Sequence, residues 1–160
     1  MFIVLSLLAC AGPLCTHHAD CEATEYCDDV CEPVRERAWE ITVVEANTEW
    51  AAPEGGPWDD DYSPPDLYVD FGVLGGEGCF TTVAWETTEP YWGQVCRFYV
   101  PPDGVLIVDV WDVDTDKDSY VTGWTWEGQD LIDQARRDES KLMLVDGSGT
   151  ITLWASMHPV

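Results

Sequence analysis

The segment "DVWDVDTDKD", residues 109–118, contains five aspartates among ten residues. Two carboxylates about 4 Å apart repel by roughly 4 kcal/mol at an effective dielectric near 20. The pattern therefore predicts either raised pKa values or a bound cation. Calcium fits best, because it accepts about six to eight oxygen ligands in a flexible arrangement, whereas Mg²⁺ needs a tighter octahedron and Zn²⁺ prefers nitrogen and sulfur.

The apolar run before these aspartates indicates how they are positioned. Successive side chains of a strand alternate between its two faces, so Leu106, Val108 and Val110 share one face. The core face of this predicted strand therefore continues into a row of acids at one end of the sheet. The acids of the same parity are Asp112, Asp114, Asp116 and Asp118.

A second acidic loop precedes another predicted strand. The Gly- and Pro-rich stretch "GGPWDDDYSPPDLYV" contains Asp59, Asp60, Asp61 and Asp66. We expect the two loops to meet at one end of the fold. An EF-hand does not explain the pattern: a loop starting at Asp112 would put a lysine at its glycine position and a glycine at its bidentate glutamate position.

The bulk composition limits the class of protein. The chain has 160 residues, 46% of them apolar, which supports one main domain with a sizeable core. Nine Trp, six Tyr and four Phe exclude a disordered chain despite the high charge. The net charge of -24 argues against nucleic-acid binding, because phosphate contacts need clustered cations.

From residue 39 onward, short runs alternate with period two between Gly, Pro and Asp clusters. The stretch 128–140, "GQDLIDQARRDES", predicts one short helix. Together these patterns predict an all-β protein, an eight-stranded antiparallel β-sandwich with one helix late in the chain. The eight strands are expected near 39–46, 67–74, 80–87, 94–101, 105–112, 120–126, 141–146 and 150–156.

The front of the chain reads as a signal peptide. Its apolar run is too short to span a bilayer, and Leu7-Leu8-Ala9-Cys10 resembles a bacterial lipobox, although no Lys or Arg precedes it. We expect residues 1–9 to be removed and Cys10 to carry lipid, which places the protein in the cell envelope, on a bacterial outer membrane, or outside the cell. An ordinary secretory signal and a buried N-terminal strand are the alternatives.

With Cys10 lipidated, six of the seven cysteines remain to pair. Residues 10–37 form a cysteine-rich segment and linker that is too small for its own core, so we expect two disulfides there. Metal binding by these cysteines is the alternative, although the paired C-x-x-C knuckles of structural zinc are absent from the sequence. The four cysteines concerned are Cys15, Cys21, Cys27 and Cys31.

The last two cysteines lie in two runs expected to be strands. If these runs pair as a hairpin about a turn near residues 87–91, Cys79 and Cys96 come opposite each other. We therefore expect a cross-strand disulfide, which would stabilise the fold by roughly 3 kcal/mol in the chain-entropy model.

Residues 38–160 resemble the C2 domain, the synaptotagmin-like calcium-binding sandwich. The resemblance runs through "PDLYVDF", "TTVAWETTEPYWGQVCRFYV", "VLIVDVWDVDTDKD" and "GTITLWASMHP". Each motif alone is weak, but their order and spacing make the match specific. The hallmark residues are the stretch 66–69, the turn residues Thr87, Pro90 and Trp92, and the strand end at 111–114.

The resemblance implies a set of calcium ligands. Those of the first loop fall on Asp60 and Asp66, and those of the third loop on Asp112, Asp114 and Asp118.

The third loop departs from the family pattern, because Tyr120 stands where the last acid usually lies. Either the loop is shorter and uses Asp118, or Asp116 substitutes. We expect Asp59, Asp61 and Asp116 to be flanking charge, although any of them could replace a neighbour.

The resemblance also implies phospholipid binding, but this sequence lacks the lysines that often assist it. Thr82, Trp85 and Glu86 occupy the corresponding positions, and the net charge of -24 repels anionic lipid. Trp58 and Tyr62 could enter a membrane interface. We expect a calcium-binding module whose partner is a membrane, a protein or a glycan.

Two other function classes remain as alternatives. One is a calcium-independent structural or adhesion protein of the cell surface. The other is a metal-dependent hydrolase, since paired carboxylates can act in hydrolysis. The sequence contains three histidines, none of them near the acidic loops, and lacks a phosphate loop and a nucleophile motif. We therefore expect no enzymatic activity.

Overall fold

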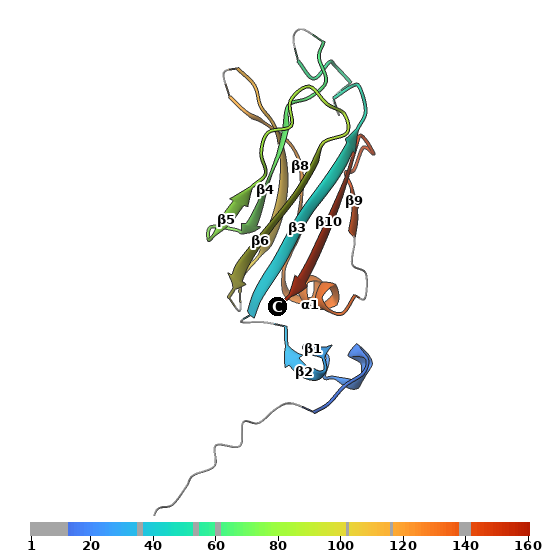
Figure 1. Ribbon diagram of the computed structural model, residues 1–160, viewed down its shortest axis with the longest axis vertical. Helices are drawn as coiled ribbons and strands as arrows, with labels where there is room; N and C mark the ends of the chain where they lie inside the picture. The colour runs from blue at the N-terminus through green and yellow to red at the C-terminus, as the bar shows by residue number, and fades with distance from the viewer. Residues whose placement is uncertain are drawn as a thin grey trace, which may run out of the picture.

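The structure is a computed structural model of a β-sandwich preceded by a small disulfide-bonded segment (Figure 1). Two four-stranded antiparallel sheets face each other, which confirms the predicted eight-stranded sandwich. The described residues are 13–34, 37–52, 55–59, 62–101, 103–115, 117–137 and 142–160. The first sheet has the order β6 (Tyr91–Val100), β3 (Arg37–Thr48), β10 (Ile151–Pro159) and β9 (Leu142–Val145). The second has the order β5 (Gly78–Phe80), β4 (Leu67–Val73), β7 (Leu106–Asp112) and β8 (Ser119–Trp126).

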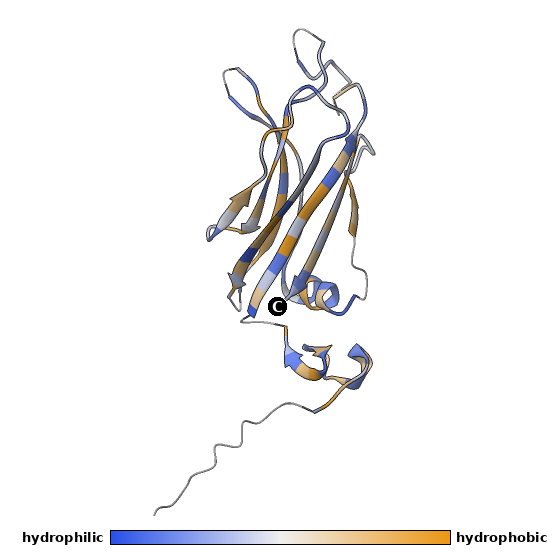
Figure 2. Cartoon of the chain, in the orientation of Figure 1, coloured by the Kyte–Doolittle hydropathy of each residue, from blue (hydrophilic) through white to orange (hydrophobic). Residues whose placement is uncertain are grey.

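Alternating side chains of the central strands form the core between the sheets. In β3 every second residue from Trp39 to Val43 is buried, and Figure 2 shows the matching alternation of hydropathy along this strand. In β7 the buried positions are Leu106, Val108, Val110 and Asp112, as the parity of the sequence predicts. The buried carboxyl at the end of this row is therefore a consequence of the strand period.

The single helix α1 (Gly128–Ala135) connects β8 to β9 at one pole of the sandwich (Figure 1). Its buried residues Leu131, Ile132 and Ala135 belong to the hydrophobic core. The predicted short helix within residues 128–140 is thus confirmed, and it ends at Ala135. Residues 138–141 lie outside the described part of the chain.

The strand expected over 80–87 is wrong for most of its length. β5 ends at Phe80. Beyond it, the Thr81 N–H donates to the Val69 carbonyl at 3.0 Å and Ala84 forms an isolated bridge with Leu67, but residues 81–90 form no further strand. Glu86 has φ +48°, which a strand cannot contain. The physical reason is that this connection must cross from the edge of one sheet to the edge of the other.

The disulfide Cys79–Cys96 is confirmed, with a Cα–Cα distance of 6.4 Å, but not for the expected reason. Its strands do not pair with each other. β5 is an edge strand of the second sheet and β6 an edge strand of the first. The bond therefore fastens the two layers of the sandwich together along one open edge.

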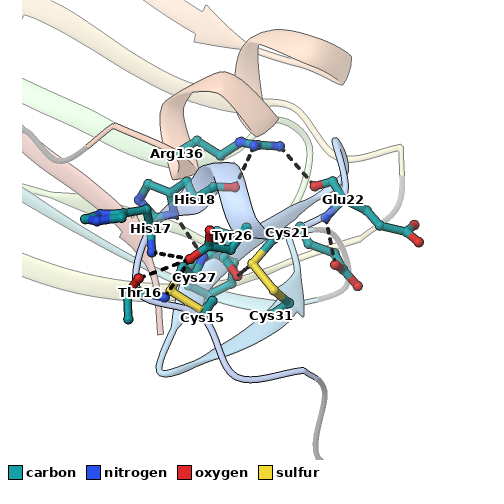
Figure 3. The surroundings of a disulfide bond; sticks show 12 residues. Cys15, Thr16, His17, His18, Cys21, Glu22, Tyr26, Cys27, Cys31 and Arg136 are labelled. Carbon is teal, nitrogen blue, oxygen red and sulfur yellow. Dashed lines mark hydrogen bonds between the residues drawn. A yellow bond between two sulfur atoms is a disulfide. The ribbon is translucent and has the colours of Figure 1, made fainter.

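The cysteine-rich segment contains the short helix η1 (His18–Asp20) and the hairpin β1 (Glu25–Asp28) and β2 (Val30–Pro33). Two disulfides hold it, as expected: Cys15–Cys27 and Cys21–Cys31, with Cα–Cα distances of 5.8 and 5.4 Å (Figure 3). All four sulfurs are thus bonded in pairs, and a sulfur in a disulfide offers no thiolate to a metal.

Arg136, the residue after α1, joins this segment to the sandwich. Its guanidinium donates hydrogen bonds to the carbonyl oxygens of His18 and Glu22, at 2.7 and 3.0 Å (Figure 3). Arg37 adds a contact at the start of β3, where its guanidinium lies 5.4 Å from the centre of the Tyr26 ring. The segment is therefore docked at the pole that carries α1.

The predicted signal peptide and the lipidation residue Cys10 lie outside the described residues. Within the described part of the chain, no helix has the length and apolar character needed to cross a membrane.

Candidate calcium site

Three connections converge at the pole opposite α1 and the cysteine-rich segment (Figure 1). They are the stretches between β3 and β4, between β5 and β6, and between β7 and β8. Both acidic loops of the sequence lie here, because antiparallel order places the end of β7 beside the start of β4.

Asp112 is the centre of the site. As the last residue of β7 it points inward, and only 3% of its surface is exposed. One oxygen, Oδ1, accepts a hydrogen bond from the main-chain N–H of Asp66 at 2.8 Å. Burial raises the pKa of Asp112 to about 6; the bond from Asp66 opposes this shift, while the charges of Asp59, Asp114 and Asp66 add to it.

The carboxylates of Asp59 and Asp114 face Asp112 closely. One ligand oxygen from each of these three residues lies within 4.8 Å of the others. Hydroxyl groups orient the two outer carboxylates: Ser63 donates to Asp59 at 3.1 Å, and Ser119 donates to Asp114 at 2.5 Å. The two acidic loops thus contribute to one cluster of oxygen ligands.

Asp66 borders the same cluster. Its Oδ1 accepts a hydrogen bond from the main-chain N–H of Glu86 at 2.5 Å, which connects the loop after β5 to the site. Asp59, Asp66 and Asp114 line a common pocket of about 800 Å³.

Asp118 lies in a different environment. It accepts a hydrogen bond from the Tyr68 hydroxyl at 3.0 Å and is not in the group formed by Asp59, Asp112 and Asp114. Burial raises the pKa of Tyr68 to about 12, and the bond to Asp118 and its charge add to that shift. Tyr68 pairs with Trp111 on the outer side of the sheet, so Asp118 is held away from the inward-facing carboxylates.

Two of the acids considered for the site, Asp60 and Asp116, lie outside the described residues, and so does Asp61. Asp59, expected as flanking charge, is instead part of the described cluster. One signal in the sequence is the tryptophan before it: the Trp58 indole N–H donates to the Glu49 carbonyl at 2.9 Å and thereby fixes this part of the loop.

This set of side chains fits calcium. The ligand atoms are carboxylate oxygens, which hard divalent cations prefer. Burial and the charges of neighbouring aspartates raise the pKa of Asp112, and a cation bound beside this carboxylate would oppose that shift. Asp59, Asp112 and Asp114 would hold the ion, with Asp66 beside them. A bound ion would offset two of these negative charges and offer further coordination positions to oxygen atoms of a partner.

Comparison with known proteins agrees with this geometry. The sequence profile of the C2 domain matches residues 38–142. A search of curated protein sequences finds no significant match.

Several solved structures share the fold. A calcium-bound structure of two C2 domains of extended synaptotagmin 2 has a TM-score of 0.58 and 21% identity over 80% of this chain and 47% of that one. A C2 domain of plant extended synaptotagmin 1 has a TM-score of 0.58 and 16% identity over 78% of this chain and 95% of that one.

Human GIVD cytosolic phospholipase A2 has a TM-score of 0.58 and 20% identity over 79% of this chain. This chain spans only 17% of that protein's length. Likeness at these identities shows the fold alone. The sequence profile covers most of the chain, and the chain therefore belongs to the C2 domain family.

Proposed function

We propose that this protein is a calcium-binding module of the cell envelope that binds a partner through its acidic loops. The observation that carries the proposal is the buried Asp112 carboxylate with Asp59 and Asp114 around it, within 4.8 Å. Outside the cytoplasm, sites with dissociation constants of about 10⁻⁴ to 10⁻³ M are useful calcium sites. A permanently occupied site suits such a compartment better than a switch.

Two features support a location outside the cytoplasm. The three disulfides among the described residues suit an oxidising compartment. The lipobox-like sequence ending at Cys10 supports a lipid anchor on a bacterial outer membrane. With attachment supplied by that lipid, the calcium site is available for a separate partner.

The partner classes are a phospholipid surface, a protein and a glycan. C2 domains generally bind calcium and phospholipid, which supports the first class. The net charge of -24 opposes binding to anionic lipid, and the ion would offset only a small part of it. Nucleic acid is opposed by the same charge.

Binding rather than catalysis is also part of the proposal. His17 and His18 belong to the cysteine-rich segment, and His158 lies near the end of β10 at the same pole, opposite the acidic cluster. A hydrolase would need a general acid or base and a positioned nucleophile beside the metal. The imidazoles of this chain are too far from the carboxylates to serve.

The proposal is tested by calorimetric titration of the disulfide-bonded chain with Ca²⁺ and, separately, Mg²⁺. We expect saturable binding of calcium that Asp114→Asn weakens at least tenfold. Asp103→Asn is the matched control, because it removes the same charge from an exposed position away from the cluster. Absence of calcium binding, or equal weakening by both variants, would refute the calcium site and favour the structural or adhesion alternative.

A further inference from the structure

Two tryptophans border the pocket beside the carboxylates. The pocket has a volume of about 800 Å³, which lies within the size range of small-molecule sites. Trp58 and Trp85 contribute aromatic surface to it, and Glu86 and Lys117 contribute further polar groups. The pocket therefore offers a ligand both aromatic surface and hydrogen-bonding groups, which a surface made of carboxylates alone does not.

Trp85 is held in an exposed position by its neighbours. Its side chain is 64% exposed, although burying a large aromatic side chain stabilises a protein by a few kcal/mol. On one side of it, Ala84 exchanges two main-chain hydrogen bonds with Leu67, at 2.8 and 3.1 Å. On the other side, the Glu86 N–H donates to Asp66 at 2.5 Å. The backbone therefore presents this indole to the pocket on a fixed support.

Trp58 is oriented in a different way. Its ring packs against the hydrophobic core, and its indole N–H is used by the hydrogen bond to the Glu49 carbonyl at 2.9 Å. With the N–H occupied, the part of the ring that lines the pocket offers an apolar contact and not a donor. The two indoles are thus positioned before any ligand arrives, which lowers the entropic cost of binding.

The charges around the pocket select the kind of ligand. Asp59, Asp66, Glu86 and Asp114 face a single lysine, Lys117, among the described lining residues. One divalent cation does not reverse this excess, so a phosphate or carboxylate ligand meets net repulsion. A neutral ligand with many hydroxyl groups avoids that penalty.

We propose that this pocket binds the terminal sugar ring of a neutral glycan. The C–H groups on one face of a pyranose are weakly positive and pack against the negative face of an indole, here Trp85. Its hydroxyl oxygens are the hard donors that calcium accepts, and its hydroxyl hydrogens can be donated to Glu86. This proposal rests on the proposed calcium function and names the ligand class of the same site.

The test uses the full disulfide-bonded chain with about 1 mM calcium, a typical extracellular level for such sites. The methyl glycosides of mannose, galactose and glucose are titrated separately, followed by calorimetry and tryptophan fluorescence. We expect at least one glycoside to bind saturably and a chelator to weaken it at least tenfold. Trp85→Ala should cause a similar loss of glycoside affinity while leaving the calcium-induced rise in melting temperature unchanged.

Trp50→Ala is the matched control, because Trp50 is 70% exposed and does not line the pocket. The glycan proposal is overturned if no glycoside binds although calcium still raises the melting temperature, or if the Trp50 and Trp85 variants lose affinity equally. Calcium-dependent pelleting with phosphatidylserine vesicles that Trp85→Ala abolishes would also overturn it, in favour of a membrane partner. If calcium does not change the melting temperature, the proposed calcium function is wrong. If a glycoside then binds in the presence of chelator, the proposal that calcium coordinates the sugar hydroxyls is wrong as well.

Discussion

The main-chain N–H of Asp66 donates a 2.8 Å hydrogen bond to Oδ1 of Asp112, two residues that are 46 positions apart in the chain. The bond joins the start of β4 to the end of β7, where the two acidic loops leave the sheet. It orients the carboxyl plane of Asp112 from within the protein. The fold of the sandwich therefore determines where this carboxylate lies. Its position is unfavourable for the calcium-free protein, because the negative charge of Asp112 is buried beside other acidic groups.

Replacing Asp112 by asparagine removes the negative charge at this position but keeps a side chain of the same shape. The amide oxygen can still accept the Asp66 bond, so we expect the calcium-free protein to be more stable by about 1–3 kcal/mol and the calcium-induced stabilisation to vanish. Asp112→Ala removes the acceptor as well and should destabilise the calcium-free protein relative to Asp112→Asn. Thermal melts in chelator and in calcium measure both effects. A calcium response retained by Asp112→Asn would contradict this role.

The raised pKa of Asp112 predicts a pH dependence of stability without calcium. The folded state binds this proton with a pKa of about 6, against an ordinary value of 3.8, so protonation favours folding. Stability from this group should rise as the pH falls from about 7 to 4, by roughly 2–3 kcal/mol, and not increase further below that. Denaturant unfolding in chelator measures the difference between wild type and Asp112→Asn. A pH-independent difference between the two proteins would exclude this explanation.

The same protonation should weaken calcium binding, because the proton and the ion compete for one carboxylate. We expect the calcium affinity measured by calorimetry to fall when the pH is lowered from 7.5 to about 5.5. Asp103→Asn should show the same fall, since its position is exposed and outside the cluster. Affinity unchanged over this range would show that Asp112 does not bind the ion.

Removing the disulfide between the two sheets should destabilise the sandwich. Cys79 and Cys96 are 17 positions apart, and a loop of that size corresponds to about 3 kcal/mol in the chain-entropy model. We expect the double alanine variant to melt about 6–12 °C lower in non-reducing buffer. The control is the Cys15 and Cys27 double alanine variant, whose bond lies in the segment at the other pole. An equal or larger fall of the sandwich transition in that control would contradict the prediction.

Arg136 should control the docking of the cysteine-rich segment. Arg136→Ala removes two charge-assisted hydrogen bonds to the carbonyls of His18 and Glu22, so we expect faster amide hydrogen exchange across residues 13–34. Calcium affinity should not change, because the site lies at the opposite pole. Arg137→Ala is the matched control of equal charge. Unchanged exchange in Arg136→Ala would show that other contacts suffice for docking.

The sandwich and the inward direction of Asp112 could be predicted from sequence because both depend on strand period. Within β7 the parity argument extends correctly from Leu106 to Asp112. It cannot be extended to Asp118, because the strand has ended and the alternation of side chains ends with it. The hydrogen bond of Asp118 to Tyr68 depends on a tertiary contact between elements 50 positions apart.

The first loop shows a second limit. Asp59, Asp60 and Asp61 are identical neighbours in a loop that has no strand alternation. The sequence alone therefore could not show which of them belongs to the cluster that contains Asp59. Its position depends on the anchored tryptophan before it. The run after Phe80 has strand-forming residues, yet it crosses between sheets, since Cys79 and Cys96 lie on edges of different layers. Tertiary connectivity overrode local preference there.

The course of β3 has a mechanical consequence. This strand leaves the cysteine-rich segment at Arg37, passes along the whole sandwich and ends at Thr48 near the acidic pole (Figure 1). It is hydrogen-bonded on both sides, to β6 and to β10. Tension between the segment and a ligand held by the loops would act along the strand, perpendicular to these bonds, and load them together in shear instead of peeling them apart one at a time. The Cys79–Cys96 bond would pass part of that force to the second sheet, so both layers of the sandwich would resist such a pull.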